Sequence, residues 1–400
     1  MEAKQYLKPY REDGRNDKSL IYALFALNAW GLIALDTSVI IDFGPIVDYS
    51  VIFIFFIWLI YGLRLKYRSS LLRLSSTLFF VVVSTFLVLS SIKLEVFYLQ
   101  RVFKGIYYFL PYFFPIILLT RRYDYSFIIK MLDITRRLIP LQFLMMIYVF
   151  LNLDSDLSDI HYLLIRLFSG ANTLLLLSNL DQFKSYKYLV FLLFVGSLIV
   201  SIMYDRRTWF LVDLMYISFF LWVNLKLRLR IFLISIIVPI VSLLSIGSLI
   251  NIANFSEVSK RGLDLEGFEQ SRSLVFEHFV SDFTDNGGWF IGRGLNGEVD
   301  RPKLLVKDGK SDYIENGYLT YILKGGWVFL TSFISLMSFS IIRLLRAKFR
   351  YTDKFALHRG MAAYVFIHLI GMIGFNVPVL HFDYLVLFIY AGYSAELNMI

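Results

Sequence analysis

The sequence predicts an all-α protein in which a single transmembrane domain, residues 1–400, crosses a lipid bilayer about twelve times. Of the 400 residues, 58% are hydrophobic and only 18% are charged, which is more apolar surface than a soluble fold buries. Aromatic residues reach 18%, a content that suits rings in contact with lipid and with the two headgroup layers. Long apolar stretches also recur along the whole chain, so we expect a polytopic integral membrane protein.

These apolar stretches set the expected order of helices. A helix needs roughly 17 to 25 mostly apolar residues to cross the hydrocarbon. Twelve stretches fit this length approximately, near residues 19–36, 45–63, 74–92, 98–119, 138–153, 160–180, 186–204, 208–225, 231–252, 317–342, 360–376 and 382–397. We therefore expect an even number of spans, with both termini on the same side.

The distribution of basic residues predicts which side that is. With both termini in the cytoplasm, the inside segments carry 25 Lys and Arg, whereas the five short outside connections carry only 5. Lys and Arg accumulate on the cytoplasmic side of membrane proteins, so this orientation is the predicted one. The net charge of +9 then reflects topology, and no nucleic acid partner is expected.

One outside connection differs from the rest because it is about sixty residues long, from 253 to 315. Seven of its residues recur at helical spacing: Leu265, Phe268, Arg272, Val275, Phe276, Phe279 and Phe283. This spacing predicts an amphipathic helix over the outer mouth of the domain. The tract Asp285-Asn286-Gly287-Gly288 marks its expected end.

Basic residues gather at the outer side in this topology, where hydrocarbon makes an unpaired charge costly. They are Arg101, Lys104, Arg166, Arg206, Arg207, Arg272 and Arg293. A phosphate or diphosphate suits such a group, because guanidinium forks bind these anions with two parallel hydrogen bonds. The alternatives are side chains that extend to the headgroups and, for Arg293, a solvated loop residue.

Two outer residues are candidates for proton transfer. Glu315 comes just before the span near 317–342, where a helix cap is the alternative role. His381 lies in the short turn between the last two spans, where an interfacial histidine is the alternative. No pattern of metal ligands is present, and the chain has no cysteine, so neither a metal nor another cofactor is expected.

Several short tracts resemble bacterial O-antigen and capsule repeat-unit polymerases, in the O-antigen polymerase and O-antigen ligase family. The tract Ser201–Trp209 (SIMYDRRTW) is similar to the junction between two spans in that family. Arg272–Phe276 (RSLVF), Trp289–Gly294 (WFIGRG), Glu315–Leu319 (ENGYL) and Gly325-Gly326 are similar to its large outside loop and the span that follows. Their order and spacing together carry the resemblance.

The resemblance implies glycosyl transfer on the outer face of the bacterial inner membrane. Its implied substrates are a glycan on undecaprenyl diphosphate and a lipid-linked acceptor sugar, and its implied further partners are membrane lipids and a chain-length regulator protein. Arg206 or Arg207 with Arg272 would hold the diphosphate, supported by Arg166 and Arg293. Glu315, with His381 as second choice, would accept the proton of the acceptor hydroxyl.

Alternatives remain open at this point. Ligases of this family generally carry His where this chain has Glu315, which favours a polymerase. The products of O-antigen, capsule and exopolysaccharide polymerases, and thus a role in lipopolysaccharide or capsule synthesis, are not distinguished by these tracts. A flippase or transporter of lipid-linked sugars would also need buried arginines, and a scaffold protein without chemistry is a third possibility.

Overall fold

The computed structural model describes ten helices and one two-stranded sheet. It covers residues 75–91, 110–121, 123–151, 169–178, 180, 183–203, 207–224, 265–300, 310–311, 314, 316–346, 352–373 and 382–397. Helices make up 87% of the described residues, which confirms the predicted all-α class. The predicted spans near 19–36, 45–63 and 231–252 lie outside the described residues.

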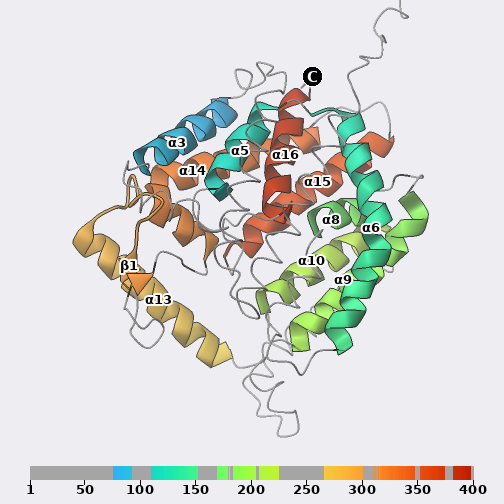
Figure 1. The fold of residues 1–400 in the computed structure, drawn as a ribbon, viewed down its shortest axis with the longest axis horizontal. Coiled ribbons are helices and arrows are strands. Elements are labelled where there is room, and N and C mark those ends of the chain that lie inside the picture. The colour runs from blue at the N-terminus through green and yellow to red at the C-terminus, as the bar shows by residue number, and fades with distance from the viewer. Residues whose placement is uncertain are drawn as a thin grey trace, which may run out of the picture.

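The described helices follow the apolar stretches of the sequence (Figure 1). They are α3 (Ser75–Ser91), α5 (Leu110–Thr120), α6 (Tyr125–Leu151), α8 (Ser169–Leu177), α9 (Lys184–Met203), α10 (Arg207–Asn224), α13 (Leu265–Asn286), α14 (Gly317–Arg346), α15 (Thr352–Gly371) and α16 (Phe382–Glu396). The strands β1 (Val299–Asp300) and β2 (Lys310–Ser311) pair antiparallel within the large loop.

Helix α6 begins well before the apolar stretch expected near 138–153. The carboxylate of Asp124 accepts a hydrogen bond from the backbone N–H of Phe127 at 2.8 Å, so Asp124 caps the helix. The helix then passes through the basic segment that was expected to be a connection, and an ion pair between Asp133 and Arg137 supports this turn. Hydropathy alone missed the start because capping and charge pairing leave no apolar signal.

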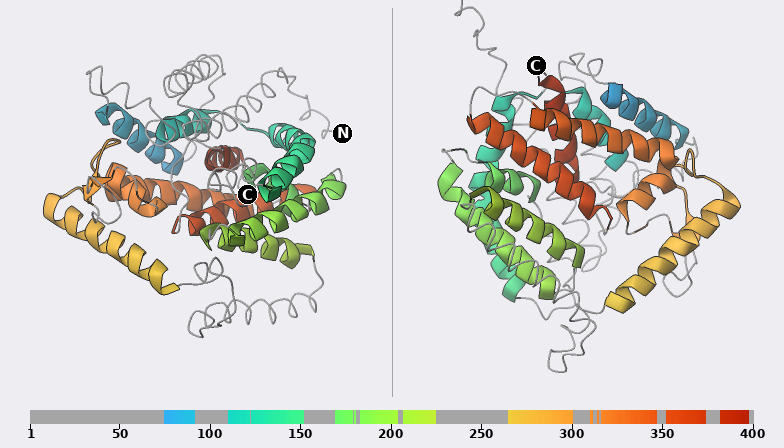
Figure 2. Two further views of the ribbon diagram at one scale, coloured as in Figure 1. Left: turned by 60° about the horizontal axis from the view of Figure 1, so that its bottom comes forward. Right: turned by 180° about the vertical axis from the view of Figure 1, so that it is seen from behind.

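The core lies where α14 packs between α3, α15 and α16 (Figures 1 and 2). Aromatic rings fill this region: the Phe80 ring lies 5.7 Å from Phe329 and 5.5 Å from Phe388, and Tyr321 lies 4.4 Å from Phe333. Rings in such arrangements add about 0.5 to 1.5 kcal/mol per pair beyond the burial of their area. The core therefore holds α14 against α3, α15 and α16.

Within the described residues, α14 alone is both long and apolar enough to cross a membrane. Helices α3, α9 and α10 contain shorter apolar stretches, at Thr77–Leu89, Ser185–Ser201 and Trp209–Asn224. Several helices also turn large apolar side chains outward, such as Phe86, which is 68% exposed, and Leu144, which is 64% exposed.

Helix α13 lies along one side of these helices, apart from most of them (Figures 1 and 2). Its bounds, Leu265–Asn286, confirm a helix where the spacing of apolar residues predicted one, and the tract Asp285–Gly288 ends it as predicted. Phe279 and Phe283 are buried and their rings stack 4.2 Å apart, while Phe276 faces outward. The chain returns from α13 through a glycine-rich turn to the start of α14.

Candidate functional site: the large loop at the break in helix α14

The predicted site residues fall into three groups. Arg293 is described in full. Arg207 is the first residue of α10, and Arg272 lies within α13, but only their backbone is described. The remaining four, Arg166, Arg206, Glu315 and His381, lie outside the described residues. The site is therefore built from Arg293 and from the segments that adjoin the others.

Helix α14 is broken near its start, at Gly325 and Gly326. Gly325 has φ −136° and ψ 15°, and Gly326 has φ 66° and ψ −168°, neither of which is helical. A positive φ with an extended ψ is open to glycine and to almost no other residue. The sequence indicated both glycines as a motif but predicted one continuous span, so the break is a new feature of the structure.

The turn Trp289–Gly294 is hydrogen bonded to the end of the first half of α14. The backbone N–H of Arg293 donates to the carbonyl of Leu323 at 2.8 Å, and that of Gly294 donates to the carbonyl of Lys324 at 3.0 Å. The last carbonyls of a helix have no partner within it and need one when buried. The turn supplies these partners.

The same turn also serves the second half of α14. The backbone N–H of Trp327 donates to the carbonyl of Trp289 at 2.8 Å, and that of Val328 donates to the carbonyl of Phe290 at 3.2 Å. These are first-turn N–H groups, which a helix leaves unpaired. The large loop is thus hydrogen bonded to both sides of the break, and the broken helix depends on it.

We expect Gly326→Ala to be strongly destabilising. An added Cβ would overlap the carbonyl of Phe290, and the left-handed backbone disfavours any side chain, at roughly 1 to 3 kcal/mol for the backbone alone. Gly287→Ala is the matched control, because Gly287 has φ +73° but nothing within 4 Å of an added Cβ. Thermal unfolding of the purified variants should show a larger fall in Tm for Gly326→Ala, and equal falls would contradict the hydrogen-bonded contact.

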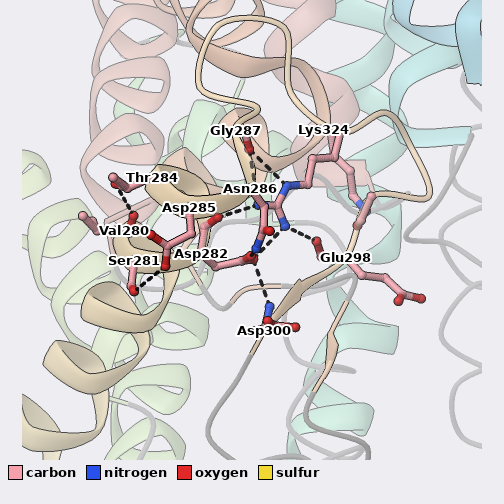
Figure 3. A network of polar contacts seen from close by, with 12 residues as sticks. Val280, Ser281, Asp282, Thr284, Asp285, Asn286, Gly287, Glu298, Asp300 and Lys324 are labelled. Carbon is pink, nitrogen blue, oxygen red and sulfur yellow. Dashed lines mark hydrogen bonds and ion pairs between the residues drawn. The ribbon is translucent and has the colours of Figure 1, made fainter.

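The guanidinium of Arg293 is fully engaged within the large loop, and Figure 3 labels the residues that supply its acceptors, Asp282, Gly287 and Glu298. It forms an ion pair with the carboxylate of Asp282 at 2.6 Å, and the Arg293 Cζ lies 4.3 Å from the centre of the Phe283 ring. Its other acceptors are the carbonyls of Glu298 at 2.7 Å, Asp282 at 3.0 Å and Gly287 at 3.3 and 3.4 Å. A guanidinium has five N–H donors, so each one has an acceptor in the protein.

These contacts bear on two of the roles considered for Arg293. Its side chain is only 20% exposed, so it is not a solvated loop residue. Arg293 connects the end of α13 to the residue before β1, because it donates to Asp282 and to the carbonyl of Glu298. Asp282 itself accepts a hydrogen bond from the backbone N–H of Asp300 in β1 at 3.1 Å. This geometry favours a structural role, and diphosphate binding by Arg293 stays a prediction.

The surroundings of Asp282 keep it ionised. Burial acts to raise the pKa of the Asp282 carboxyl, but hydrogen bonds from Arg293, Asn286 and the Asp300 backbone, together with the Arg293 charge, lower this pKa below its ordinary value. A carboxyl with a lowered pKa contributes stability above its ordinary pKa and loses it as the pH falls through the folded value. The connection between α13 and the turn should therefore hold at neutral pH and weaken only in acid.

Lys324, which the sequence analysis did not single out, is also part of this region. It is 2% exposed, and its ammonium donates to the carbonyls of Leu295 at 2.8 Å and Gly297 at 3.2 Å. The residue ends the first half of α14, where a positive charge is favourable beside the helix carbonyls. A lysine directly before two glycines was the signal that could have identified it.

The first residues of α14 contact the end of α15. Asn316 caps α14, because its side-chain oxygen accepts a hydrogen bond from the N–H of Leu319 at 3.1 Å. Its side-chain nitrogen donates to the carbonyl of Ile373 at 2.8 Å, and the hydroxyl of Tyr318 donates to that of Leu369 at 2.6 Å. Asn316 therefore caps α14, and a further cap by its neighbour Glu315 stays the alternative to proton transfer.

The start of α16 joins the same end of the bundle. The hydroxyl groups of Tyr321 and Tyr384 lie 2.8 Å apart, and the hydroxyl of Tyr364 donates to the backbone carbonyl of Asp383 at 2.7 Å. Asp383 is 7% exposed and follows His381 by two residues in the sequence. The segments next to Glu315 and next to His381 therefore pack at one end of the bundle.

Buried ionisable residues in the described helices were a further omission of the sequence analysis. Asp213 in α10 is fully buried and accepts a hydrogen bond from the Ser197 hydroxyl at 2.7 Å, and His368 in α15 is 5% exposed. Each stands within an apolar run, which was the available signal. Among the described residues, no group of three or more His, Asp and Glu side chains could hold a metal ion.

Comparison with known proteins gives no further assignment: no family model matches the chain, and no curated protein or solved structure matches it.

Proposed function

We propose that this chain is a polysaccharide polymerase of the bacterial inner membrane, which transfers a glycan from undecaprenyl diphosphate to a lipid-linked acceptor sugar. One observation supports the proposal: two tracts about thirty residues apart that resemble one family are hydrogen bonded to each other at the break in α14. The turn Trp289–Gly294 contacts Gly325-Gly326, and Arg293 connects that turn to α13, which contains Arg272. The tract that begins at Glu315 leads into the same helix.

The proposed reaction needs no metal. The acceptor hydroxyl attacks the anomeric carbon of the donor, the new glycosidic bond forms, and the bond to the diphosphate oxygen breaks. Glu315 takes the hydroxyl proton, with His381 as the second candidate. Arg206 or Arg207 and Arg272 stabilise the negative charge that develops on the diphosphate, and Arg166 supports them.

A position in the membrane is supported by the outward faces of the helices. Exposed apolar residues such as Phe86 and Leu144 would be costly in water but favourable against acyl chains. After its break, α14 continues from Gly326 to Arg346, a length of about 30 Å at 1.5 Å per residue, which matches the hydrocarbon core. The length of α14 supports one such span, and the proposal of twelve spans with cytoplasmic termini rests on the apolar stretches and the distribution of basic residues.

The break in α14 does not favour a transporter. In transporters, broken helices leave unpaired backbone groups near the middle of the membrane, and these groups bind the substrate or ion. Here the carbonyls of Leu323 and Lys324 and the N–H groups of Trp327 and Val328 are already bonded to the large loop. The break also comes after only about 12 Å of α14, near one end of the helix.

The proposal is tested by adding purified full-length protein in proteoliposomes to lipid-linked repeat units and separating the products by size. A polymerase produces a ladder of lengthened glycans. If the protein adds one glycan to a lipid A core and makes no ladder, it is a ligase. If no glycosidic bond forms while the lipid-linked sugar crosses the vesicle membrane, the protein is a transporter and the proposed polymerase function is wrong.

Replacement of Arg272 by lysine tests whether polymer formation depends on the shape of the guanidinium group or only on its positive charge. Arg272→Lys keeps the charge but loses the two parallel hydrogen bonds to a diphosphate, so polymer formation should fall at least about tenfold. The measurement is the initial rate of the polymer assay, normalised to folded protein. Arg261→Lys, in the part of the large loop that precedes α13, is the control for a general loss of guanidinium groups. Near-normal rates for both Arg272→Lys and Arg272→Ala would remove this residue from the site.

A further inference from the structure

The tip of the glycine-rich turn exposes two large apolar side chains next to each other. Phe290 is 71% exposed and Ile291 is 67% exposed. They lie between Gly288 and Gly292, and the stretch 287–292 contains no charged residue. Adjacent exposed apolar residues on a short turn indicate a surface that contacts an apolar partner.

The turn cannot bury these side chains by folding back. The carbonyl of Phe290 is bonded to the N–H of Val328, and Trp289 stacks on Trp327 with ring centres 6.4 Å apart and an interplanar angle of 14°. Gly292 faces the backbone of Gly325 so closely that an added Cβ would lie 2.5 Å from its nitrogen. The tip is therefore held beside the first turn of the second half of α14.

The tip continues an apolar face of α14. This outward face begins at Trp327, which is 47% exposed, and its large apolar members are Trp327, Ile334, Phe339, Ile342 and Leu345. If α14 crosses the bilayer as proposed, this face contacts acyl chains. Trp327 then lies at the boundary with the headgroups, where tryptophan is enriched. Phe290 and Ile291 are held at the same depth.

Two backbone carbonyls at the tip are already paired within the protein. The carbonyls of Trp289 and Phe290 both accept hydrogen bonds from α14, so neither needs water. The charged residue nearest to the tip in the sequence is Arg293, and its guanidinium forms an ion pair with Asp282. A protein partner would be expected to meet some polar groups at its rim, but this tip offers side chains suited to lipid.

We propose that Phe290 and Ile291 insert into the outer leaflet, at the boundary between headgroups and acyl chains, and anchor the large loop to the membrane. The inference rests on the membrane position in the proposed function. Because the turn is bonded to α14 and connected to α13 through Arg293, this anchor sets the height of both helices above the bilayer. It places the α13–α14 connection at the depth where a lipid-linked diphosphate lies.

The chain has no cysteine, so single spin labels can test the anchor in the full-length protein. Ile291→Cys, Ser281→Cys and Ile334→Cys are labelled with a nitroxide and reconstituted in phosphatidylglycerol and phosphatidylethanolamine vesicles. Accessibility to oxygen, which concentrates in the bilayer, is compared with accessibility to a water-soluble nickel chelate. Ser281 is an exposed residue of α13, and Ile334 lies on the outward face of α14.

The proposal expects the label at residue 291 to favour oxygen over nickel, with a ratio between those of the labels at residues 334 and 281. A ratio at residue 291 equal to that at residue 281 places the tip in water and overturns the anchor. A label at residue 291 that is immobile and shielded from both reagents shows a protein contact and also overturns it. If residue 334 itself favours nickel, α14 does not cross the bilayer, and the membrane position in the proposed function fails instead.

Discussion

Purified Glu315→Gln protein should fold normally and make little or no polymer. A general base that accepts the acceptor proton contributes about 100-fold to 10,000-fold in rate, and glutamine cannot take that proton. The measurement is the initial rate of glycan lengthening in proteoliposomes, together with the thermal unfolding midpoint of the same preparation. We expect a large fall in rate without a matching fall in Tm.

Two control variants separate catalysis from helix capping. Asn316→Ala removes the side chain that caps α14, so it should lower stability by about 1 kcal/mol, with a loss of rate no larger than its loss of folded protein. Glu277→Gln makes the same chemical change at an exposed position of α13 and should leave both quantities unchanged. If Glu315→Gln retains most of its polymer formation, Glu315 is not the base, and the His381→Gln variant becomes the next test.

Arg293→Ala should be among the most destabilising single substitutions in the described part of the chain. It leaves the carboxylate of Asp282, whose side chain is only 5% exposed, without its charged partner. Loss of one member of a buried ion pair typically costs about 3 to 5 kcal/mol, and the partial exposure of Arg293 places this case near the lower value. The measurement is the unfolding midpoint of the purified protein at pH 7 and at about pH 2, which is below the ordinary pKa of the Asp282 carboxyl.

The direction of the pH effect provides an additional check. The lowered pKa of Asp282 means that the native pair contributes fully at pH 7 and loses its contribution as acid protonates the carboxyl. The difference in stability between native protein and Arg293→Ala should therefore shrink at low pH. Arg137→Ala is the control, because it breaks an ion pair whose arginine is 67% exposed and should cost about 0.5 kcal/mol or less. Equal effects of the two variants would contradict the structural role of Arg293.

The sequence predicted those parts of the fold that depend on uninterrupted local patterns. Helices α3, α9 and α10 begin and end within about two residues of the expected spans, because their apolar runs have no strong breaker inside. Helix α13 was predicted from the spacing of Phe276, Phe279 and Phe283. In each case the residues that predict the helix lie within one or two helical turns of each other.

The contacts that organise the candidate site were not predictable in this way. The bonds between the turn at Trp289–Gly294 and the break in α14 join backbone groups, which carry no side-chain signal. Arg293 and Asp282 are eleven residues apart, across a turn whose direction depends on the left-handed conformations of Gly287 and Gly288. From sequence Lys324 is a costly charge in an apolar span, whereas in the structure its ammonium donates to loop carbonyls that come from outside that span.

The bonds across the break in α14 have a consequence for the order in which the chain assembles. The turn at residues 289–294 is made before the helix that it completes, and it lies only about thirty residues upstream, so closing this loop costs little chain entropy. The other contacts of the same helix, from Asn316 and Tyr318 to the end of α15, reach more than fifty residues further along. In the proposed topology, the turn must first reach the outer side of the membrane before α14 can complete its first half. Biogenesis of this region should then proceed from the α13–α14 pair toward α15, so a truncation after Arg346 should already protect the turn from protease.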